Sequence, residues 1–260
     1  MTFALGPKAI AAGYRLDARE SVGSTNAEAL AAARTGDAGR LWVVSDHQSA
    51  GKGRRNSAWQ TPRGNLAATI LSVVPVKPET AATLGFVAGL CLDEAVRKVA
   101  PVAPERLRLK WPNDVLLDGR KLAGILLEAE IRGDGRVAVA VGIGVNVVGA
   151  PAGLPYPAMA LADLGIAVTA ADLFLPLAEA WAGVAAAWDE GRGFPALRRA
   201  GLARAAGIGK PVSVRVGRDV LSGTFETIDG EGRLVIRAAD GGERTISAGE
   251  VHLGGAATAR

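Results

Sequence analysis

Apolar and polar residues follow two different patterns along this chain, and the change between them divides it into two parts. Up to about residue 206, some segments carry apolar residues at helical spacing and others are short β-branched runs. This mixture predicts an α+β fold. From Lys210 onward, short alternating runs recur between turns rich in Gly and Asp. We therefore predict two domains, residues 1–206 and 207–260, with a boundary near Gly207.

The first part is predicted to contain four helices and a set of strands. Thr25 and Glu28 have the spacing of a capping box that begins the first helix, and Pro101 ends the second. A turn at Asp118 and Gly119 joins two of the strands into a hairpin. The helices are expected at residues 24–36, 78–100, 171–190 and 194–206. The strands are expected at residues 41–45, 66–74, 107–111, 115–117, 122–130 and 137–148.

The second part is predicted to be a small β-barrel, because its short strands follow one another at the spacing that such barrels need. The strands are expected at residues 212–216, 220–228, 234–237 and 244–247. Residues 151–160, rich in Pro and Ala, are expected to form a loop. The tail, residues 254–260, is small and polar and is expected to fray.

Composition limits the chemistry that the chain can carry. The one cysteine, Cys91, lies in an apolar helical run and is expected to be a buried structural thiol. Two histidines, His47 and His252, leave little for a zinc cluster or a Ser-His-Asp site. No run approaches the roughly 18 apolar residues of a membrane span, and no secretory signal is recognisable, so a cytoplasmic protein is expected.

A basic glycine loop follows the first expected strand. Gly51 and Gly53 let the backbone come close to a ligand, and Lys52, Arg54 and Arg55 can neutralise an oxyanion. The loop matches neither a dinucleotide-binding turn nor a P-loop. A mobile basic loop is the alternative to an anion site.

A second segment presents polar residues at the end of a strand. Pro112 bends the chain, so that Asn113 and Asp114 stand at a strand terminus, where Asp114 could accept a hydrogen bond or reach Mg²⁺. The hairpin brings Lys121 back near Asp114, which predicts an ion pair. The alternative is an ordinary turn with a solvated lysine.

Two more features allow a structural and a functional interpretation. Gly142 and Gly144 inside an apolar strand indicate a bulge or a close approach of another group. Asn146 falls where a strand would bury it and needs a partner, either an adenine edge or a backbone amide. A polar triplet at the start of the first helix serves either as a cap or as a site for a polar ring: Ser24, Thr25 and Asn26.

In their order along the chain and in their residues, these blocks resemble the sequence motifs of the biotin–protein ligase family. The blocks are Ser-Thr-Asn, Gln-x-x-Gly-Lys-Gly-Arg-Arg-x-x-x-Trp, Lys-Trp-Pro-Asn-Asp, Arg-Lys-Leu-Ala-Gly-Ile-Leu-x-Glu and Gly-Ile-Gly-x-Asn. The resemblance runs from about Gly23 to Val147. Its most specific parts are residues 110–114 and 121–128.

The resemblance implies a fold and an activity. The fold would be a class II aminoacyl-tRNA-synthetase-like mixed sheet with helices, followed by a small SH3-like β-barrel. Biotin and ATP would condense to biotinoyl-5′-AMP with release of pyrophosphate and with Mg²⁺ as cofactor. A specific lysine in the biotin carboxyl carrier domain of a biotin-dependent carboxylase would then attack the anhydride. The expected protein is a monomer or homodimer that binds neither nucleic acid nor membrane.

The resemblance also implies roles for residues of this chain. Lys121, Arg54 and Asp114 are the expected catalytic residues, with Lys121 at the junction of the biotin carboxylate and the α-phosphate. The metal ligands stay open. Biotin is expected to contact Ser24, Thr25, Asn26, Gln48, Lys52, Gly53, Arg54, Lys121 and Gly124. ATP or the adenylate is expected to contact Gly51, Arg54, Trp59, Asn113, Lys121, Gly144 and Asn146.

The chain departs from the family pattern in two ways. Lys52 stands where the family usually has Arg, and Asn56 where it usually has Gly, so the ordering of the loop is the property most affected. Only 23 residues precede Ser24, fewer than the helix-turn-helix domain of the bifunctional members needs. A monofunctional type that binds no operator is therefore expected.

Three alternatives stay open. The first is a lipoate–protein ligase of related fold, although its signature differs in the loop. The second is a nucleic-acid-binding protein, suggested by a net charge of +4, but residues 210–253 contain one aromatic residue, Phe225. The third is a biotin-binding or scaffolding protein without catalysis.

Overall fold

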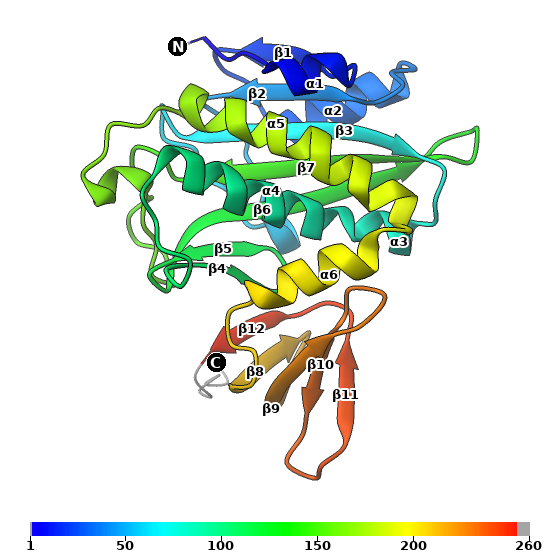
Figure 1. The fold of residues 1–260 in the computed structure, drawn as a ribbon, viewed down its shortest axis with the longest axis vertical. Helices are drawn as coiled ribbons and strands as arrows, with labels where there is room; N and C mark the ends of the chain where they lie inside the picture. Colours follow the sequence, from blue (N-terminus) through cyan, green and yellow to red (C-terminus); the bar gives the residue numbers. More distant parts are fainter. Residues whose placement is uncertain (1, 254–260) are drawn as a thin grey trace.

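A computed structural model of the chain describes residues 2–253 and contains two β-sheets of different size (Figure 1). The larger sheet has seven strands in the order β1-β2-β3-β7-β6-β5-β4, and the smaller has five in the order β11-β10-β9-β8-β12. The predicted α+β class is confirmed, while closure of the smaller sheet into a barrel stays a prediction. The predicted fraying of residues 254–260 falls outside the described residues.

The larger sheet is antiparallel except where β1 runs parallel to β2. The predicted turn at Asp118 and Gly119 joins β5 to β6, and both residues have positive φ, 50° and 73°, as a tight hairpin turn requires. The strands are β1 Arg15–Arg19, β2 Leu41–Ser45, β3 Leu66–Val74, β4 Leu107–Lys110, β5 Asp114–Leu117, β6 Arg120–Ile131 and β7 Val137–Val145.

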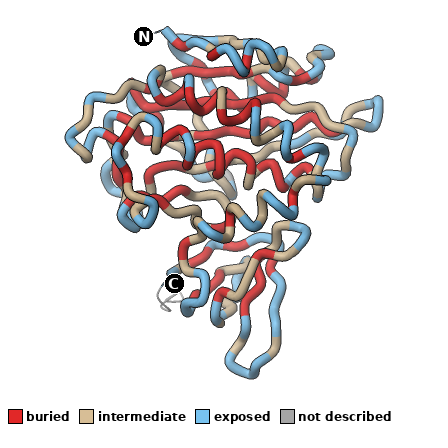
Figure 2. The backbone as a smooth tube through the Cα atoms, viewed as in Figure 1, coloured by how far each residue is buried: buried red, intermediate tan, exposed pale blue. Residues whose placement is uncertain are grey.

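Helices cover both faces of the larger sheet. In Figure 1, α4 and α5 cross its near face, and α2 lies behind it. The near face holds the main core, in which Trp42 of β2 meets Phe174 and Trp181 of α5 edge to face, with ring centroids 5.4 and 5.9 Å apart. Figure 2 shows the same strands and helices as the most buried part of the chain. The helices are α1 Pro7–Ala11, α2 Thr25–Arg34, α3 Pro78–Ala82, α4 Leu84–Val99, α5 Ala170–Trp188 and α6 Phe194–Ala203.

The smaller sheet is wholly antiparallel and has its own apolar core. Its last strand, which the sequence pattern did not predict, pairs with β8. That strand is only four residues long, Glu250-Val251-His252-Leu253, so its alternation of polar and apolar residues is too short to stand out in the sequence. The strands are β8 Pro211–Val216, β9 Asp219–Ile228, β10 Leu234–Arg237, β11 Glu243–Ile246 and β12 Glu250–Leu253.

Two predictions about helix ends are wrong. Ser24, and not Thr25, is the N-cap of α2, and its hydroxyl oxygen accepts a hydrogen bond from the Ala27 N–H. Thr25 lies inside the first turn, because its hydroxyl is engaged with neighbouring buried polar groups. The helix expected at residues 78–100 is broken at Thr83, whose hydroxyl donates to the Thr80 carbonyl and accepts from the Trp188 indole.

The sequence pattern also missed β1, α1 and three short 3₁₀ turns at Arg54–Asn56, Leu161–Leu164 and Asp189–Gly191. β1 is a polar strand at the edge of the larger sheet, so it lacks an apolar period. Its charges are paired: Arg15 with Asp37 at 2.7 Å, and Arg19 with Glu28 at 2.8 Å.

α5 belongs to a segment, Ala170–Gly191, that by length and composition alone is apolar enough to cross a membrane. The segment is not an uninterrupted apolar run, because Asp172, Glu179 and Asp189 lie within it, but its mean hydropathy is high. Half of its most apolar stretch is buried inside the protein, as in a core helix. Cys91 of α4 is buried as predicted, and burial raises the pKa of its thiol well above its usual range.

The two sheets are joined through Trp111 and the segment that follows α6. The Trp111 side chain is 8% exposed, belongs to the core of the smaller sheet and donates its indole N–H to the Gly232 carbonyl at 3.0 Å. Leu109 of β4 donates to Arg204 and accepts from Ala206, which extends the edge of the larger sheet by a parallel bridge. Trp111 thus follows directly after β4 of the larger sheet but is part of the core of the smaller one.

We expect Trp111→Ala to lower the stability of the smaller sheet by about 3–5 kcal/mol, because the substitution leaves a cavity in its core. Hydrogen–deuterium exchange should show faster exchange of the β8–β10 amides than in the wild type, with β3 and β7 unchanged. Trp111→Phe is the matched control, since it keeps most of the apolar contact and loses about 1 kcal/mol with the indole hydrogen bond. Equal exchange in the wild type and the alanine variant would contradict this role.

Candidate functional site

A cavity of about 850 Å³ lies where β2 ends, β3 and β6 begin, and β12 of the smaller sheet approaches. Thirteen of the fifteen predicted site residues line it, whereas Gly51 and Asn146 lie outside its lining. The predicted residues in the lining are Ser24, Thr25, Asn26, Gln48, Lys52, Gly53, Arg54, Trp59, Asn113, Asp114, Lys121, Gly124 and Gly144. The side chain of Asn56, which bears on the predicted behaviour of the loop, is outside the described part of the chain.

Glycines hollow the floor of the cavity. In the β6–β7 ladder, Gly124 lies opposite Gly144, and the indole of Trp59 covers both. A Cβ atom on Gly144 would lie 2.4 Å from the Trp59 Nε1 atom, and one on Gly142 would lie 2.3 Å from the Asn26 Oδ1 atom. These glycines therefore mark close approach, one of the two interpretations that the sequence left open.

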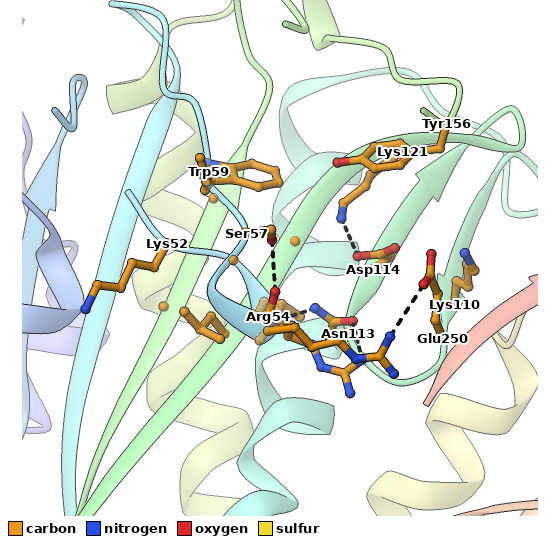
Figure 3. Close-up of a pocket in the computed structure, with 18 of the residues that line it drawn as sticks. Lys52, Arg54, Ser57, Trp59, Lys110, Asn113, Asp114, Lys121, Tyr156 and Glu250 are labelled. Carbon is orange, nitrogen blue, oxygen red and sulfur yellow. Dashed lines mark hydrogen bonds and ion pairs between the residues drawn. The ribbon is translucent and has the colours of Figure 1, made fainter. Parts of the chain in front are cut away.

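Lys121 and Asp114 form the predicted ion pair, with Lys121 Nζ 2.7 Å from Asp114 Oδ1 and each side chain about one-sixth exposed. The β5–β6 hairpin brings the two strands into register, and the Lys121 backbone also pairs with residues 157–159. The Lys121 ammonium group lies 5.5 Å from the ring centroid of Trp59 and 5.0 Å from that of Tyr156 (Figure 3). Two aromatic rings and one carboxylate thus fix this cation in place.

The basic loop is tied to the smaller sheet. Arg54 donates to the Gly249 carbonyl at 3.0 Å and to the Asn113 side-chain oxygen at 3.4 Å. Arg55, which adopts a left-handed φ of 55°, lies 3.6 Å from a carboxylate oxygen of Glu250. Both arginines thus link the loop to the segment that contains β12.

Arg54 is the loop cation that is half-buried at the cavity wall, whereas Lys52 is exposed. Burial lowers the pKa of the Arg54 guanidinium, and the charge of Arg55 lowers it further, while Asp114 and Glu250 act in the opposite direction. The guanidinium stays charged at any ordinary pH. Because it is partly desolvated, pairing with an anion would stabilise it more than pairing in water would.

One wall of the cavity is polar and uncharged. Gln48 accepts the Thr25 backbone N–H through its side-chain oxygen at 2.8 Å, and Ser24 is 6% exposed at the helix start. Asn26 also lines this wall, but its amide donates to Glu128 at 2.8 Å. Thr69, which the sequence analysis missed because it looks like any β-branched strand residue, holds Thr25 and Asn26 from behind.

Asn146 and Gly51 support the site from behind its lining. Asn146 is 2% exposed, and its amide donates to the Met159 carbonyl at 3.2 Å, so its partner is a backbone group and not a cavity-facing one. Gly51 accepts from the Trp59 backbone N–H at 2.9 Å, and a Cβ atom on it would lie 2.3 Å from the Trp59 carbonyl oxygen.

The charges that line the cavity favour an anionic ligand, because six cations face two carboxylates. The cations are Lys52, Arg54, Arg55, Lys110, Lys121 and Arg215, and the carboxylates are Asp114 and Glu250. Sequence analysis did not single out Arg215, Glu250 and Tyr156 for the site, since two of them come from the smaller sheet. Tyr156, an aromatic residue between two prolines in a loop, was the one with a recognisable signal.

Comparison with known proteins gives matches over nearly the whole chain. The Biotin/lipoate A/B protein ligase family model matches residues 24–146, and the Biotin protein ligase C terminal domain model matches residues 207–254. The chain is 44% identical over 238 residues to a biotin–[acetyl-CoA-carboxylase] ligase of Paracoccus denitrificans, which covers 89% of this chain and 98% of that relative. A protein of the same name from Mycobacterium tuberculosis is 37% identical and covers 93% and 90%.

A solved structure shares the fold. The biotin protein ligase of Aquifex aeolicus, in complex with biotin and ATP, superposes with a TM-score of 0.76 at 22% identity. The match covers 93% of this chain and 99% of that one. At this identity the likeness supports the fold, and the sequence matches support the family.

Gly144→Ala should displace the Trp59 indole, because the new methyl group takes the space of the ring. Overpacking of this kind costs about 1–3 kcal/mol, which for a chain of this size lowers Tm by roughly 2–4 °C per kcal/mol. Acrylamide should then quench a larger share of the tryptophan emission. Gly149→Ala is the control, since its Cβ atom would meet open space. Unchanged quenching in Gly144→Ala would show that the ring does not sit there.

Proposed function

The chain belongs to the biotin/lipoate A/B protein ligase family, and from this membership and the geometry of the cavity we propose that it is a biotin–[biotin carboxyl carrier protein] ligase. It joins biotin to ATP as biotinoyl-5′-AMP, releases pyrophosphate, and transfers the biotinoyl group to a lysine of a carrier domain. The observation that carries this proposal is one cavity with a neutral hydrogen-bonding wall, at Thr25 and Gln48, and a fixed cation, Lys121.

Biotin has the two kinds of group that this cavity can bind. Its ureido ring would lie against the neutral wall, and its carboxylate would extend toward Lys121. The glycine floor lets the Trp59 indole lie flat against the strands, so the ring system of biotin would lie between this indole and the neutral wall. Biotin is assigned to Ser24, Thr25, Asn26, Gln48, Lys52, Gly53, Arg54, Lys121 and Gly124. Asn26 would support the neutral wall through its hydrogen bonds with Thr69 and Glu128.

The first step brings a carboxylate against a triphosphate. The biotin carboxylate oxygen attacks the α-phosphorus, and the bond to pyrophosphate breaks. Lys121 and Arg54 would offset the negative charge that gathers there, the main contribution that fixed groups make to phosphoryl transfer. The adenylate is assigned to Gly51, Arg54, Trp59, Asn113, Lys121, Gly144 and Asn146, where Gly51 and Asn146 support the lining from behind.

In the second step the carrier supplies the nucleophile. Its lysine amine attacks the biotinoyl carbonyl, AMP leaves, and an amide forms, so this chain needs no nucleophilic side chain of its own. Asp114 and Asn113 would keep Lys121 oriented through the ion pair and the β5–β6 edge. Trp59 and Tyr156 would shield the anhydride from water.

Mg²⁺ is the metal that we propose for the ATP step. Asp114 and Glu250 are the carboxylates in the cavity lining, and the described residues contain no group of three His, Cys, Asp or Glu side chains able to hold a metal alone. This donor set fits Mg²⁺, which is usually bound by one or two carboxylates together with substrate phosphates and water. When bound, the ion would neutralise phosphate charge, and Asp114 is the residue that we assign to it.

The two-domain division, the partner and the location are part of the same proposal. Residues 1–206 would form the catalytic domain, and residues 207–260 a barrel-like domain that adds Arg215 and Glu250 to the cavity. The partner would be the carrier domain of a biotin-dependent carboxylase, met in the cytoplasm by a monomer or homodimer. Phe225 is 1% exposed in the core of the smaller sheet, so it offers no stacking surface to nucleic acid.

The protein should label a biotin carboxyl carrier domain in the presence of biotin, ATP and Mg²⁺, as read by streptavidin blotting. Lys121→Gln should lower the rate by about 10²–10³, the cost of losing one charge-stabilising donor. Omitting ATP should abolish labelling, which separates a ligase from a biotin-binding protein without catalysis. Labelling with lipoate and not with biotin would favour the lipoate–protein ligase alternative and overturn this proposal.

Arg54→Ala should let the adenylate escape, because the half-buried cation that faces its phosphate is gone. Incubated with biotin, ATP and serum albumin, the variant should biotinylate albumin lysines well above the wild-type level, as measured by mass spectrometry. Arg54→Lys keeps the positive charge but not the bidentate guanidinium, so it should release less adenylate than Arg54→Ala does. If Arg54→Ala stayed specific for the carrier domain, the role of Arg54 in retention would be wrong.

A further inference from the structure

A buried carboxylate lies where the larger sheet meets the segment that leads to the smaller one. Asp93 of α4 is 2% exposed, and both of its oxygens accept hydrogen bonds from arginines. Arg97 donates from Nη2 to Oδ1 at 2.8 Å and from Nε to Oδ2 at 3.1 Å. Arg204 donates from Nε to Oδ2 at 2.9 Å. None of these three residues lines the cavity.

Arg97 connects this carboxylate to the segment that precedes β4. It lies one turn after Asp93 on α4, and its guanidinium also donates to the carbonyls of Val102 and Pro104, at 3.2 and 3.3 Å. Both of these residues lie between the end of α4 and the start of β4. Because Arg97 binds both oxygens of Asp93, it offsets the buried charge within the part of the chain that carries the larger sheet.

Arg204 connects the same carboxylate to the segment between the two sheets. It follows α6 directly, and its carbonyl accepts the Leu109 N–H of β4 at 2.9 Å. Ala206 donates to the Leu109 carbonyl at 2.8 Å, so residues 204–206 run beside β4 through a parallel bridge. The contact between Asp93 and Arg204 therefore lies at the point where the chain leaves the larger sheet for the smaller one.

The position of the smaller sheet matters to the cavity, because this sheet supplies part of the lining. The residues that it supplies are Arg215, Glu250, His252 and Leu253. The neutral wall at Thr25 and Gln48 belongs instead to the part of the chain that carries the larger sheet. A shift of the smaller sheet would therefore alter the charged part of the cavity and leave the neutral wall in place.

We propose that Asp93 and Arg204 are positioning residues that hold the smaller sheet at the cavity, where its charged side chains act on the phosphates of ATP. The proposal rests on the proposed function, which places biotin against the neutral wall and the phosphates among the cations. Neither residue touches a ligand, and their effect passes through residues 204–206. Because Asp93 is buried, its attraction to Arg204 is screened by salt less than that of a surface ion pair.

The two arginines allow positioning to be separated from stability. Asp93→Asn would remove the charge that both arginines bind and is expected to unfold the protein, so the test uses the arginines instead. Arg97→Gln takes two donors from a buried carboxylate and should lower Tm by roughly 10 °C. Arg204→Gln leaves both Arg97 donors in place and should lower Tm by only roughly 2–4 °C.

The kinetic effects of the two variants should have the opposite order. With the full chain and saturating biotin and carrier domain, Arg204→Gln should raise KM for ATP roughly three- to tenfold, because the arrangement that binds ATP is populated less. The Kd of biotin, measured by calorimetry without ATP, should stay within twofold. Arg97→Gln should keep KM for ATP within twofold, and Arg204→Lys, which keeps the charge, should restore most of the wild-type value.

Hydrogen–deuterium exchange tests the placement without reference to activity. Arg204→Gln should speed exchange of the Leu109 and Ala206 amides, which join β4 to residues 204–206, and should leave β3 and β7 unchanged. Faster exchange throughout the protein, or equal increases in KM for ATP and Kd for biotin, would show general loosening and overturn the proposal. A KM for ATP that follows Tm across the variants would overturn it as well.

The same experiment distinguishes this inference from the proposed function. A wild-type protein that transfers no biotin to the carrier domain would refute the proposed function. An active wild type, beside an Arg204→Gln variant with unchanged KM for ATP and unchanged exchange at Ala206, would refute this inference alone.

Discussion

The pairing of β6 with β7 is the constraint on which the rest of the structure depends. The ladder runs from Ala123 opposite Val145 to Ile131 opposite Val137, and it places Gly124 opposite Gly144 at its beginning. Because these two glycines have no side chains, the sheet has a hollow at this position, whereas side chains cover both of its faces elsewhere. Trp59 enters that hollow from the loop, and Lys121 stands three residues before Gly124 on the same strand. A cavity next to the buried core is possible because the ladder holds its shape without side chains.

Local patterns in the sequence were enough to find the groups of this site that lie close together along the chain. The turn at Asp118 and Gly119 fixes the hairpin, and the hairpin fixes the distance between Asp114 and Lys121. Contacts made by tertiary packing had no such signal. Thr69 looks like any strand residue, and Glu250 lies in a strand that the pattern did not predict. The capping-box interpretation of Thr25 failed for the same reason, because buried partners elsewhere in the chain compete for its hydroxyl.

The loop and the smaller sheet are linked through Arg54. Its guanidinium donates to two neutral oxygens, Gly249 O and Asn113 Oδ1. An anion is a stronger partner for a half-buried cation than a carbonyl is. An anion bound to Arg54 would therefore compete with the contact between the loop and the smaller sheet.

The outer strand β1 has a consequence for how the protein behaves at high concentration. An unpaired strand edge is a template for another chain, and cells avoid such edges because they seed aggregates. Here the edge carries charges already engaged with the body of the protein, Arg15 with Asp37 and Arg19 with Glu28. At the opposite edge, the backbone of residues 204–206 covers β4. A second molecule that extended the larger sheet would therefore meet charged side chains at one edge and the inter-sheet linker at the other.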